Sequence, residues 1–454
     1  MNSISSQQLA DILGVPIVAG RGDVMISAGV STDTRQLALG CVFFALRGEN
    51  FNADTFAVDA LGKGAVVAVV HEWQGKAPTD TAVIVVPDTL RALQKLASWW
   101  RIQLDIPIIA ITGSNGKTST KDFTAAVLAQ RFNVSATRGN LNNHIGLPLS
   151  ILETTKEHTV AVWEMGMNHP GEIAPLCNIA QPQYGIITNI GTAHIEFLGS
   201  REAIAIEKGA LARALPTDGF FFIPKSCEWT DMIRQDSLAT MITVESDDCP
   251  VRAENLRFGN DVTNFTLVVE DSESVEVSLP VLGRHMVTNA LLAAAVGWKL
   301  GISPAEIAAG LSSTALTSGR LGRYDSRGVT VIDDTYNANP ESMAAAIETL
   351  SDTPISAGAR RIIVLGRMGE LGVHALAAHV RTGALASEKN LTVIAVGEGA
   401  EGIANGAGNA PYFSDLDEAA EWLKHEVKSG DVVLFKGSRT ATVERVMHAV
   451  FPKP

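Results

Sequence analysis

The fold of this chain is decided by the stretch Ile106-Pro107-Ile108-Ile109-Ala110-Ile111-Thr112-Gly113-Ser114-Asn115-Gly116-Lys117-Thr118-Ser119. Its first six residues form a nearly continuous apolar run, which is typical of a strand in a parallel sheet that is buried on both faces. A glycine-rich turn follows, and residues 118–131 then have the length of a helix. A strand, a turn that ends in Gly-Lys-Thr and a helix, in this order, predict a phosphate-binding loop in an α/β domain.

The residues of this turn fit the chemistry of phosphate binding. Backbone N–H groups at the start of a helix hold phosphate oxygens, Lys117 reaches the terminal phosphates, and the hydroxyl of Thr118 can hold Mg²⁺. The usual pattern has a further glycine where this chain has Ile111, so the loop is a variant in which Gly113 makes the turn. A turn with a purely structural role is the alternative, but its position between strand and helix favours nucleotide binding. The residues expected to bind the nucleotide here are Gly113, Ser114, Asn115, Gly116, Lys117, Thr118 and Ser119.

The composition is that of a globular protein with several domains. The chain has 454 residues, which predicts roughly three domains. Its 36 basic and 49 acidic side chains give a net charge of −13, which argues against duplex DNA or an anionic membrane as a partner but not against small anionic ligands. The four cysteines form no CxxC pair, and neither a secretory leader pattern nor a membrane-length apolar run stands out. We therefore expect a cytoplasmic protein.

The order of the expected elements divides the chain into three α/β domains. Residues 1–88 are expected to form a small N-terminal α/β domain, residues 89–313 a central parallel-sheet domain around the phosphate loop, and residues 314–454 a Rossmann-like C-terminal domain. The expected strands lie at residues 41–46, 65–70 and 82–86, then 106–111, 134–136, 159–164 and 185–188, and finally 329–333, 361–365, 392–396 and 432–435. Between residues 241 and 282, apolar and polar residues alternate, which predicts half-exposed antiparallel strands. The stretch 312–319 is expected to be a hinge.

Three further side chains of the central domain follow its expected strands. Glu164 ends a strand of the sheet that carries the phosphate loop, so it is well placed to bind the Mg²⁺ held by Thr118, although it could instead cap the next helix. His194 lies in a loop after the next strand, where a lone histidine is more often structural. Lys208 is on a helix, where an isolated lysine is nearly always a solvated charge. The residues themselves therefore give Lys208 no role.

The C-terminal domain has polar turns at three strand ends. The richest turn is Asp333-Asp334-Thr335-Tyr336-Asn337-Ala338-Asn339-Pro340, which can bind a ribose or a polar substrate, or can simply cap a helix. The other two turns are residues 366–371 and residues 436–439. Three such turns in one domain predict a binding edge that faces the phosphate loop.

Taken together, these motifs resemble those of the Mur ligase family. The resemblance covers essentially the whole chain and rests on the phosphate loop, the strand end at Glu164, the Asn-Ile-Gly-Thr-Ala-His loop that ends at His194, Gly283-Arg284-His285 with Asn289, and the turn at residues 333–340. It implies an ATP-dependent amide ligase. In such an enzyme, ATP phosphorylates a terminal carboxylate, an amine attacks the resulting acyl phosphate, and phosphate leaves.

The resemblance also implies an acceptor. Within the family, the turn Tyr336-Asn337-Ala338-Asn339-Pro340 and the stretches 139–143 and 365–372 favour the member that adds D-alanyl-D-alanine to UDP-N-acetylmuramoyl-tripeptide. The chain also lacks Asp-Asn-Pro-Arg, by which the ligase that adds diaminopimelate reads its amino acid. The sequence does not define the third residue of the tripeptide. We expect a monomer that acts on small molecules and binds no nucleic acid.

Roles for individual residues follow from the same resemblance. Lys117 and a Mg²⁺ near Thr118 and Glu164 would neutralise the γ-phosphate and the carboxylate. A second Mg²⁺ would be held by Glu164, His194 and a carbamylated Lys208. Further nucleotide contacts are implied for Asn289, for Arg320 or Arg323, and for Asp334. Substrate contacts are implied for Ser31, Thr32 and Arg47 at the UDP end, within residues 31–35 and 47–54, for Asn140, Asn142 and Asn143, and for Asn337 and Asn339 at the dipeptide.

Two other functions stay open at this point. A ligase of the same family that adds diaminopimelate, lysine or glutamate would keep the chemistry and change the acceptor, and the turn at residues 336–340 weighs against it. A P-loop phosphotransferase or nucleotide-driven switch, which belongs to a different class, would explain Lys117. It would leave His194 and the C-terminal turn without a task.

Overall fold

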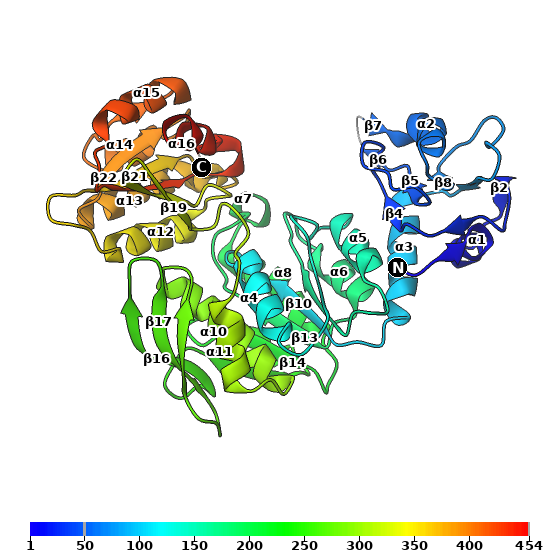
Figure 1. Cartoon of the computed structure of the whole chain (residues 1–454), viewed down its shortest axis with the longest axis horizontal. Coiled ribbons are helices and arrows are strands. Elements are labelled where there is room, and N and C mark those ends of the chain that lie inside the picture. Colours follow the sequence, from blue (N-terminus) through cyan, green and yellow to red (C-terminus); the bar gives the residue numbers. More distant parts are fainter. Residues whose placement is uncertain (49–50, 453–454) are drawn as a thin grey trace.

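The computed structural model describes residues 1–48 and 51–452. Glu49 and Asn50, which belong to the stretch expected at the UDP end, lie outside the described residues. Figure 1 shows three bodies, with the N-terminal body in blue, the central body in cyan and green, and the C-terminal body in yellow to red. Each body is built around its own main sheet, so the α/β class expected from the sequence is confirmed. The exact domain boundaries remain predictions.

The N-terminal body has a five-stranded sheet in the order β2-β9-β8-β5-β4. Its strands pair in parallel except for β2 with β9, which are antiparallel. The three strands expected from apolar runs are present as β5, β8 and β9. The elements are β1 (Ile4–Ser5), α1 (Ser6–Leu13), β2 (Ile17–Gly20), β3 (Met25–Ile26), β4 (Val30–Ser31), β5 (Val42–Phe44), β6 (Arg47–Gly48), β7 (Phe51–Asn52), η1 (Ala53–Phe56), α2 (Ala57–Gly62), β8 (Val67–Val70) and β9 (Ala82–Val85).

Helix α3 (Thr89–Ile102) connects the N-terminal and central bodies. It begins where Asp88 accepts a 2.9 Å hydrogen bond from the backbone N–H of Arg91, which is the cap expected from the sequence. At its other end, the buried guanidinium of Arg101 donates to the carbonyl oxygens of Ala180 and Gln181, at 2.6 and 3.0 Å. These hydrogen bonds fix the end of α3 to the central body.

The central body has a nine-stranded sheet in the order β11-β12-β10-β13-β14-β15-β16-β17-β18. Pairing is parallel from β11 to β16 and antiparallel from β16 to β18. The antiparallel strands expected between residues 241 and 282 are confirmed for β16 to β18, but β15 in the same stretch pairs in parallel with β14. Strand β14 was not anticipated. The strands are β10 (Ile108–Thr112), β11 (Val134–Ala136), β12 (Val160–Glu164), β13 (Tyr184–Ile187), β14 (Phe220–Pro224), β15 (Thr240–Val244), β16 (Val251–Phe258), β17 (Thr263–Val269) and β18 (Val275–Leu279).

Helices cover this sheet and bury the apolar strand residues. Strand β10 is buried along its whole length, as expected for a central parallel strand. Helix α4, which starts at the phosphate loop, packs against α10 and α11. The helices are α4 (Lys117–Leu128), α5 (Gly146–Glu153), α6 (Ile173–Ala180), α7 (Ile195–Leu198), α8 (Arg201–Arg213), α9 (Thr230–Gln235), α10 (Arg284–Lys299) and α11 (Pro304–Ser312).

The C-terminal body has a six-stranded sheet in the order β19-β20-β24-β21-β22-β23, parallel except for β19 with β20. The four strands expected here are present, and β19 and β23 were not anticipated. The elements are β19 (Gly322–Ser326), β20 (Val329–Asp333), α12 (Pro340–Asp352), β21 (Arg361–Gly366), η2 (Gly372–His374), α13 (Ala375–Glu388), β22 (Thr392–Val396), α14 (Glu401–Gly406), β23 (Tyr412–Phe413), α15 (Leu416–Glu426), β24 (Val432–Lys436), η3 (Arg439–Ala441) and α16 (Glu444–Val450). Among the described residues, no helix is long and apolar enough to cross a membrane.

Candidate active site

The phosphate loop lies between β10 and α4, and its shape depends on two glycines. Gly113 has φ 150° and Gly116 has φ 78°, conformations that side chains rarely adopt. A Cβ atom at Gly113 would lie 1.8 Å from Oγ1 of Thr188, so only glycine fits against the neighbouring strand end. A Cβ atom at Gly116 would lie 2.7 Å from Oδ1 of Asn289 on α10. This contact places Asn289, an expected nucleotide ligand, directly against the loop.

The loop after β13 holds the phosphate loop in place. The backbone N–H of Asn115 donates to Oδ1 of Asn189 at 2.8 Å, and the N–H of Ser114 donates to the backbone carbonyl oxygen of Asn189 at 3.1 Å. In the other direction, the N–H of Gly191 donates to the Ser114 hydroxyl at 2.8 Å. No role was predicted for Asn189. Its position just after a buried strand of the same sheet is the sequence feature that could have indicated one.

Lys117 is held over its own loop. Its Nζ donates a 2.8 Å hydrogen bond to the carbonyl oxygen of Gly113. Burial lowers the pKa of Lys117, against the attraction of Glu164. A cation in this position, at the start of a helix, can neutralise the charge of a phosphate group.

The hydroxyl of Thr118 forms hydrogen bonds with both Glu164 and Arg320. Thr118 donates through Oγ1 to Oε2 of Glu164 at 2.9 Å and accepts a 2.9 Å hydrogen bond from Nη2 of Arg320. Glu164 is only 2% exposed, and its other oxygen accepts a 2.9 Å hydrogen bond from the side-chain amide of Asn142. A hydroxyl and a buried carboxylate side by side are the hard oxygen donors that Mg²⁺ prefers. These two groups therefore fit a magnesium ion that would also bind phosphate oxygens.

The other two expected metal ligands have different surroundings. His194 precedes α7 with φ 66°, and its Nδ1 lies 2.6 Å from Oε2 of Glu370, a residue of the C-terminal body. Lys208 on α8 is 1% exposed and forms no ion pair with any described residue. Burial, followed by the nearby charge of Lys117, holds the pKa of Lys208 well below its usual range. In the described part of the chain, no group of three or more His, Cys, Asp or Glu side chains is arranged to hold a metal.

The polar turn of the C-terminal body reaches the phosphate loop. Asn339 caps α12, and its Nδ2 donates a 2.7 Å hydrogen bond to Oδ1 of Asn115. Asp334 lies 2.6 Å from Nζ of Lys436, which also donates to the carbonyl oxygen of Asn337 at 3.0 Å. Burial raises the pKa of Asp334, against the attraction of Lys436. Asn339 therefore contacts the phosphate loop, whereas Asp334 and Asn337 are held by Lys436 within the C-terminal body.

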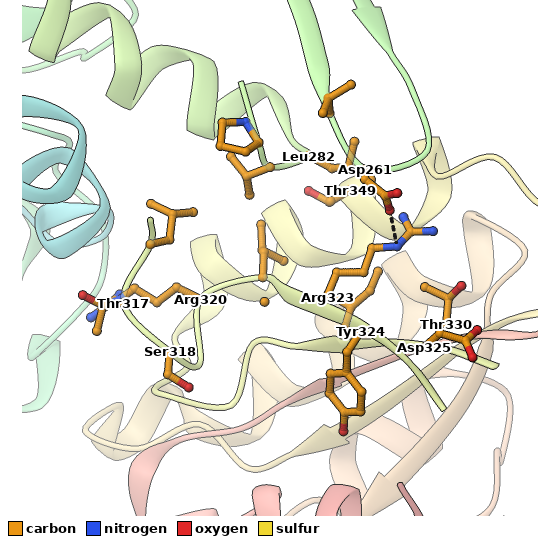
Figure 2. Close-up of a pocket in the computed structure, with 17 residues that line it drawn as sticks. Asp261, Leu282, Thr317, Ser318, Arg320, Arg323, Tyr324, Asp325, Thr330 and Thr349 are labelled. Carbon is orange, nitrogen blue, oxygen red and sulfur yellow. Dashed lines mark ion pairs between the residues drawn. The ribbon is translucent and has the colours of Figure 1, made fainter. Parts of the chain in front are cut away.

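Arg320 directly follows the stretch 312–319 and lines a cavity between the central and C-terminal bodies. The guanidinium carbon of Arg320 is 4.3 Å from the centre of the Tyr336 ring, which orients its head toward Thr118. The cavity has a volume of about 590 Å³, and Arg323 at its lining forms a 2.8 Å ion pair with Asp261. Figure 2 shows Arg320 near one end of the cavity and this ion pair near the other. Arg320, and not Arg323, is therefore the arginine that contacts the phosphate-loop helix.

The residues expected at the UDP end lie in the N-terminal body. Ser31 donates to the carbonyl oxygen of Asp33 at 3.0 Å, and Arg47 pairs with Asp54 at 2.6 Å. Thr32 lies between β4 and β5. No hydrogen bond among the described residues joins these side chains to the phosphate loop. Asn140 and Asn143 are on the loop that carries Asn142, and Asn143 accepts from the N–H of Gly146 at 2.8 Å.

Comparison with known proteins defines the class of this protein. Residues 111–297 match the Mur ligase middle domain, and residues 319–439 match the Mur ligase, glutamate ligase domain. The chain belongs to the Mur ligase family and is an ATP-dependent ligase.

Within this family, the chain is similar along its full length to MurF enzymes. It is 36% identical to the UDP-N-acetylmuramoyl-tripeptide–D-alanyl-D-alanine ligase of Escherichia coli K12, with 99% of each chain covered. The crystal structure of MurF from Acinetobacter baumannii matches with a TM-score of 0.91 at 32% identity and covers all of both chains. MurF ligase from Thermotoga maritima in complex with ADP matches with a TM-score of 0.82 at 27% identity, covering 93% of this chain and 96% of that one.

Proposed function

We propose that this protein joins D-alanyl-D-alanine to UDP-N-acetylmuramoyl-tripeptide, with ATP converted to ADP and phosphate. This reaction is the last peptide addition in the cytoplasmic synthesis of peptidoglycan precursors, and we propose that the enzyme performs it as a monomer. The proposal rests on the full-length similarity to MurF relatives and on one observation at the site. Thr118 on the phosphate-loop helix is hydrogen-bonded both to Glu164 and to Arg320, which precedes the first strand of the C-terminal body.

The chemical difficulty of this reaction is charge. A γ-phosphate must approach the carboxylate of the tripeptide although both groups are negative. Lys117 and Arg320 supply two cations beside the phosphate loop, and the N-terminus of α4 supplies backbone N–H groups. Together they favour transfer of the phosphoryl group to the carboxylate. The acyl phosphate then loses phosphate when the amine of the dipeptide attacks its carbonyl carbon.

Thr118 and Glu164 would hold one Mg²⁺, which would supply a further positive charge to the phosphate oxygens. We propose that Glu164, His194 and Lys208 hold a second Mg²⁺ once Lys208 is carbamylated. A neutral amine is the form that reacts with carbon dioxide, and the lowered pKa of Lys208 favours that form at neutral pH. The carbamate would turn a group that repels metal into an anion that binds it.

The remaining assignments concern ATP, the incoming dipeptide and the UDP-linked substrate. We propose that Asp334 and Asn289 contact the nucleotide and that Asn337 and Asn339 lie beside the incoming dipeptide. Their uncharged donors and acceptors suit its internal amide. At the other end of the molecule, the UDP-sugar is assigned to the N-terminal body and to the loop of Asn142. The residues assigned to this substrate are Ser31, Thr32, Arg47, Asn140, Asn142 and Asn143.

Dependence of ADP formation on the substrates tests this function. Purified protein with ATP and Mg²⁺ should form ADP at a sustained rate only when UDP-N-acetylmuramoyl-tripeptide and D-alanyl-D-alanine are both present. A nucleotide-driven switch would instead hydrolyse ATP without the amine, and a ligase for another acceptor would need a different amine. Steady ADP formation without the dipeptide would contradict the proposed function.

A further inference from the structure

We propose that Glu341 is a positioning residue that couples docking of the C-terminal body to the shape of the phosphate loop. Glu341 lies in the first turn of α12, on the C-terminal body. Its Oε1 accepts a 3.0 Å hydrogen bond from the backbone N–H of Thr192, and its Oε2 accepts a 3.1 Å hydrogen bond from the Thr192 hydroxyl. The two residues are 149 positions apart in the sequence, so this two-point contact exists only when the bodies are docked.

Gly191, the residue before Thr192, makes this contact possible. A Cβ atom at Gly191 would lie 2.8 Å from both Cδ and Oε2 of Glu341, closer than side-chain atoms are found in proteins. Glycine at this position therefore lets the carboxylate approach the backbone of the loop. A methyl group there would push Glu341 away without any change at Glu341 itself.

The same glycine is also bonded to the phosphate loop. Its N–H donates to the Ser114 hydroxyl at 2.8 Å, while the next N–H along the chain, that of Thr192, donates to Glu341. The backbone of Gly191 is thus held from one side by the phosphate loop and from the other side by the C-terminal body. If α12 moves relative to the loop after β13, the position of Gly191 changes, and with it the hydrogen bond between Gly191 and Ser114.

This arrangement gives Glu341 a task in the proposed ligase reaction, and the inference rests on that function. Glu341 makes no contact with the phosphate-loop lysine, so we assign it no chemical step. Its carboxylate favours the docked state, in which Arg320 and Asn339 reach the phosphate loop. The phosphate loop belongs to the central body, whereas in the proposed reaction phosphoryl transfer would take place in the docked state. Loss of the contact should therefore lower kcat more than it raises the KM for ATP.

Kinetics of matched variants test this role. Glu341→Ala and Gly191→Ala should each lower kcat roughly 10-fold or more, because hydrogen bonds to a carboxylate are strong. The KM for ATP should change by less than about threefold. Glu341→Gln, which keeps one acceptor oxygen, should fall between Glu341→Ala and the parent. Glu348→Ala, at an exposed position of the same helix, should match the parent.

The double variant, with both Glu341→Ala and Gly191→Ala, shows whether the two substitutions break the same contact or act independently. The double variant should be no slower than the slower single variant, because both substitutions break the same contact. Multiplied effects in the double variant would overturn the proposal. Parent-like kcat in Glu341→Ala would also overturn it.

Hydrogen exchange separates this inference from the proposed function. In the parent protein, ATP with Mg²⁺ should slow amide exchange in residues 188–195, and this protection should be lost in Glu341→Ala but kept in Glu348→Ala. The readout requires no dipeptide, so it can succeed even if the acceptor is assigned wrongly. Equal protection of this loop in Glu341→Ala and in the parent would overturn the coupling, whichever product the enzyme makes.

Discussion

The side-chain amide of Asn339 lies 2.7 Å from the side-chain oxygen of Asn115, so the residue that caps a helix of the C-terminal body also touches the phosphate loop of the central body. The two residues are 224 positions apart. This contact, with that of Arg320 on Thr118, means that the C-terminal body is docked over the loop in this structure. The phosphate loop and the C-terminal body are therefore linked through named side chains.

Substitution of Asn339 can separate its two tasks. Asn339→Ser keeps an oxygen that caps α12 but is too short to reach Asn115, so stability should change by less than about 1 kcal/mol while kcat falls several-fold. Asn339→Ala should lose the cap as well and unfold more easily, by about 1 kcal/mol. Thermal unfolding and steady-state kinetics of the two variants check this separation. Full activity of Asn339→Ser would show that the contact with Asn115 has no part in turnover.

Removal of the phosphate-loop cation should abolish most of the activity. Lys117→Ala deletes the ammonium that stabilises the transferring phosphoryl group, which should lower kcat by roughly 10²-fold or more. Folding should be retained, because the hydrogen bond that Lys117 forms among the described residues goes to its own loop. The control is Lys156→Ala, an exposed lysine of the same body. Turnover close to that of the parent in folded Lys117→Ala would contradict the nucleotide assignment.

Glu164 should set the response to magnesium. Glu164→Gln keeps the shape of the side chain but removes its charge, so the Mg²⁺ concentration that gives half-maximal activity should rise at least about 10-fold. An activity titration with Mg²⁺ at saturating ATP measures this value. Glu157→Gln, at an exposed position, serves as the control and should leave the titration unchanged. An unaltered titration in Glu164→Gln would place the metal elsewhere.

Carbamylation of Lys208 can be observed directly. Protein equilibrated with ¹³C-labelled bicarbonate should give one carbamate carbon signal in its NMR spectrum, and Lys208→Ala should lack that signal. Lys208→Ala should also be nearly inactive, with partial recovery in the presence of short carboxylic acids that replace the carbamate. Absence of a carbamate signal from the parent protein under turnover conditions would contradict carbamylation and leave Lys208 with a purely structural role.

The stability of the C-terminal body should depend on Asp431 in a pH-dependent way. Burial alone would raise the pKa of Asp431, but hydrogen bonds from Arg360, at 2.7 Å, and from the N–H of Lys428, at 3.0 Å, outweigh burial and lower it. A lowered pKa means that the ionised group stabilises the fold above pH ~4, and that this contribution disappears as pH falls through the folded-state pKa.

Asp431→Asn tests this dependence. At pH 7 the variant should be less stable than the parent by about 1–3 kcal/mol, since the charged acceptor of several hydrogen bonds is lost. The difference should shrink below pH ~4. Amide exchange in β24, measured across this pH range, reports the local free energy of opening. An equal difference at pH 7 and pH 3 would contradict the assigned role of the ionised group.

Local sequence signals predicted several elements of the central body and of the helix that leads into it. β10, the glycine-rich turn and the Asp88 cap of α3 were predictable because a buried parallel strand, a loop and a cap each have a signature within a few residues. β19 was missed because this strand pairs at the edge of its sheet and has polar residues along most of its length. A strand of this kind lacks the apolar run or regular alternation that marks a buried one.

The side-chain contacts between the central and C-terminal bodies could not be predicted from the sequence. His194 was expected to face a metal, and its partner in the structure is Glu370 from another body. Likewise, nothing local to Glu341 points to Thr192. Such contacts depend on how two folded bodies dock, which involves many weak side-chain contacts and has no period or motif in one sequence. Residue types at strand ends could be predicted, but their partners could not, and the roles assigned to them remain predictions.

The mass of the product identifies the amine that the enzyme joins to the tripeptide. The enzyme is given UDP-N-acetylmuramoyl-tripeptide, ATP and Mg²⁺ with an equimolar mixture of D-alanyl-D-alanine, diaminopimelate, lysine and glutamate, and the nucleotide-peptide product is weighed by mass spectrometry. We expect one product, heavier than the tripeptide substrate by D-alanyl-D-alanine less one water, formed together with ADP. A product that carries any of the other three amines at a comparable rate would contradict this expectation.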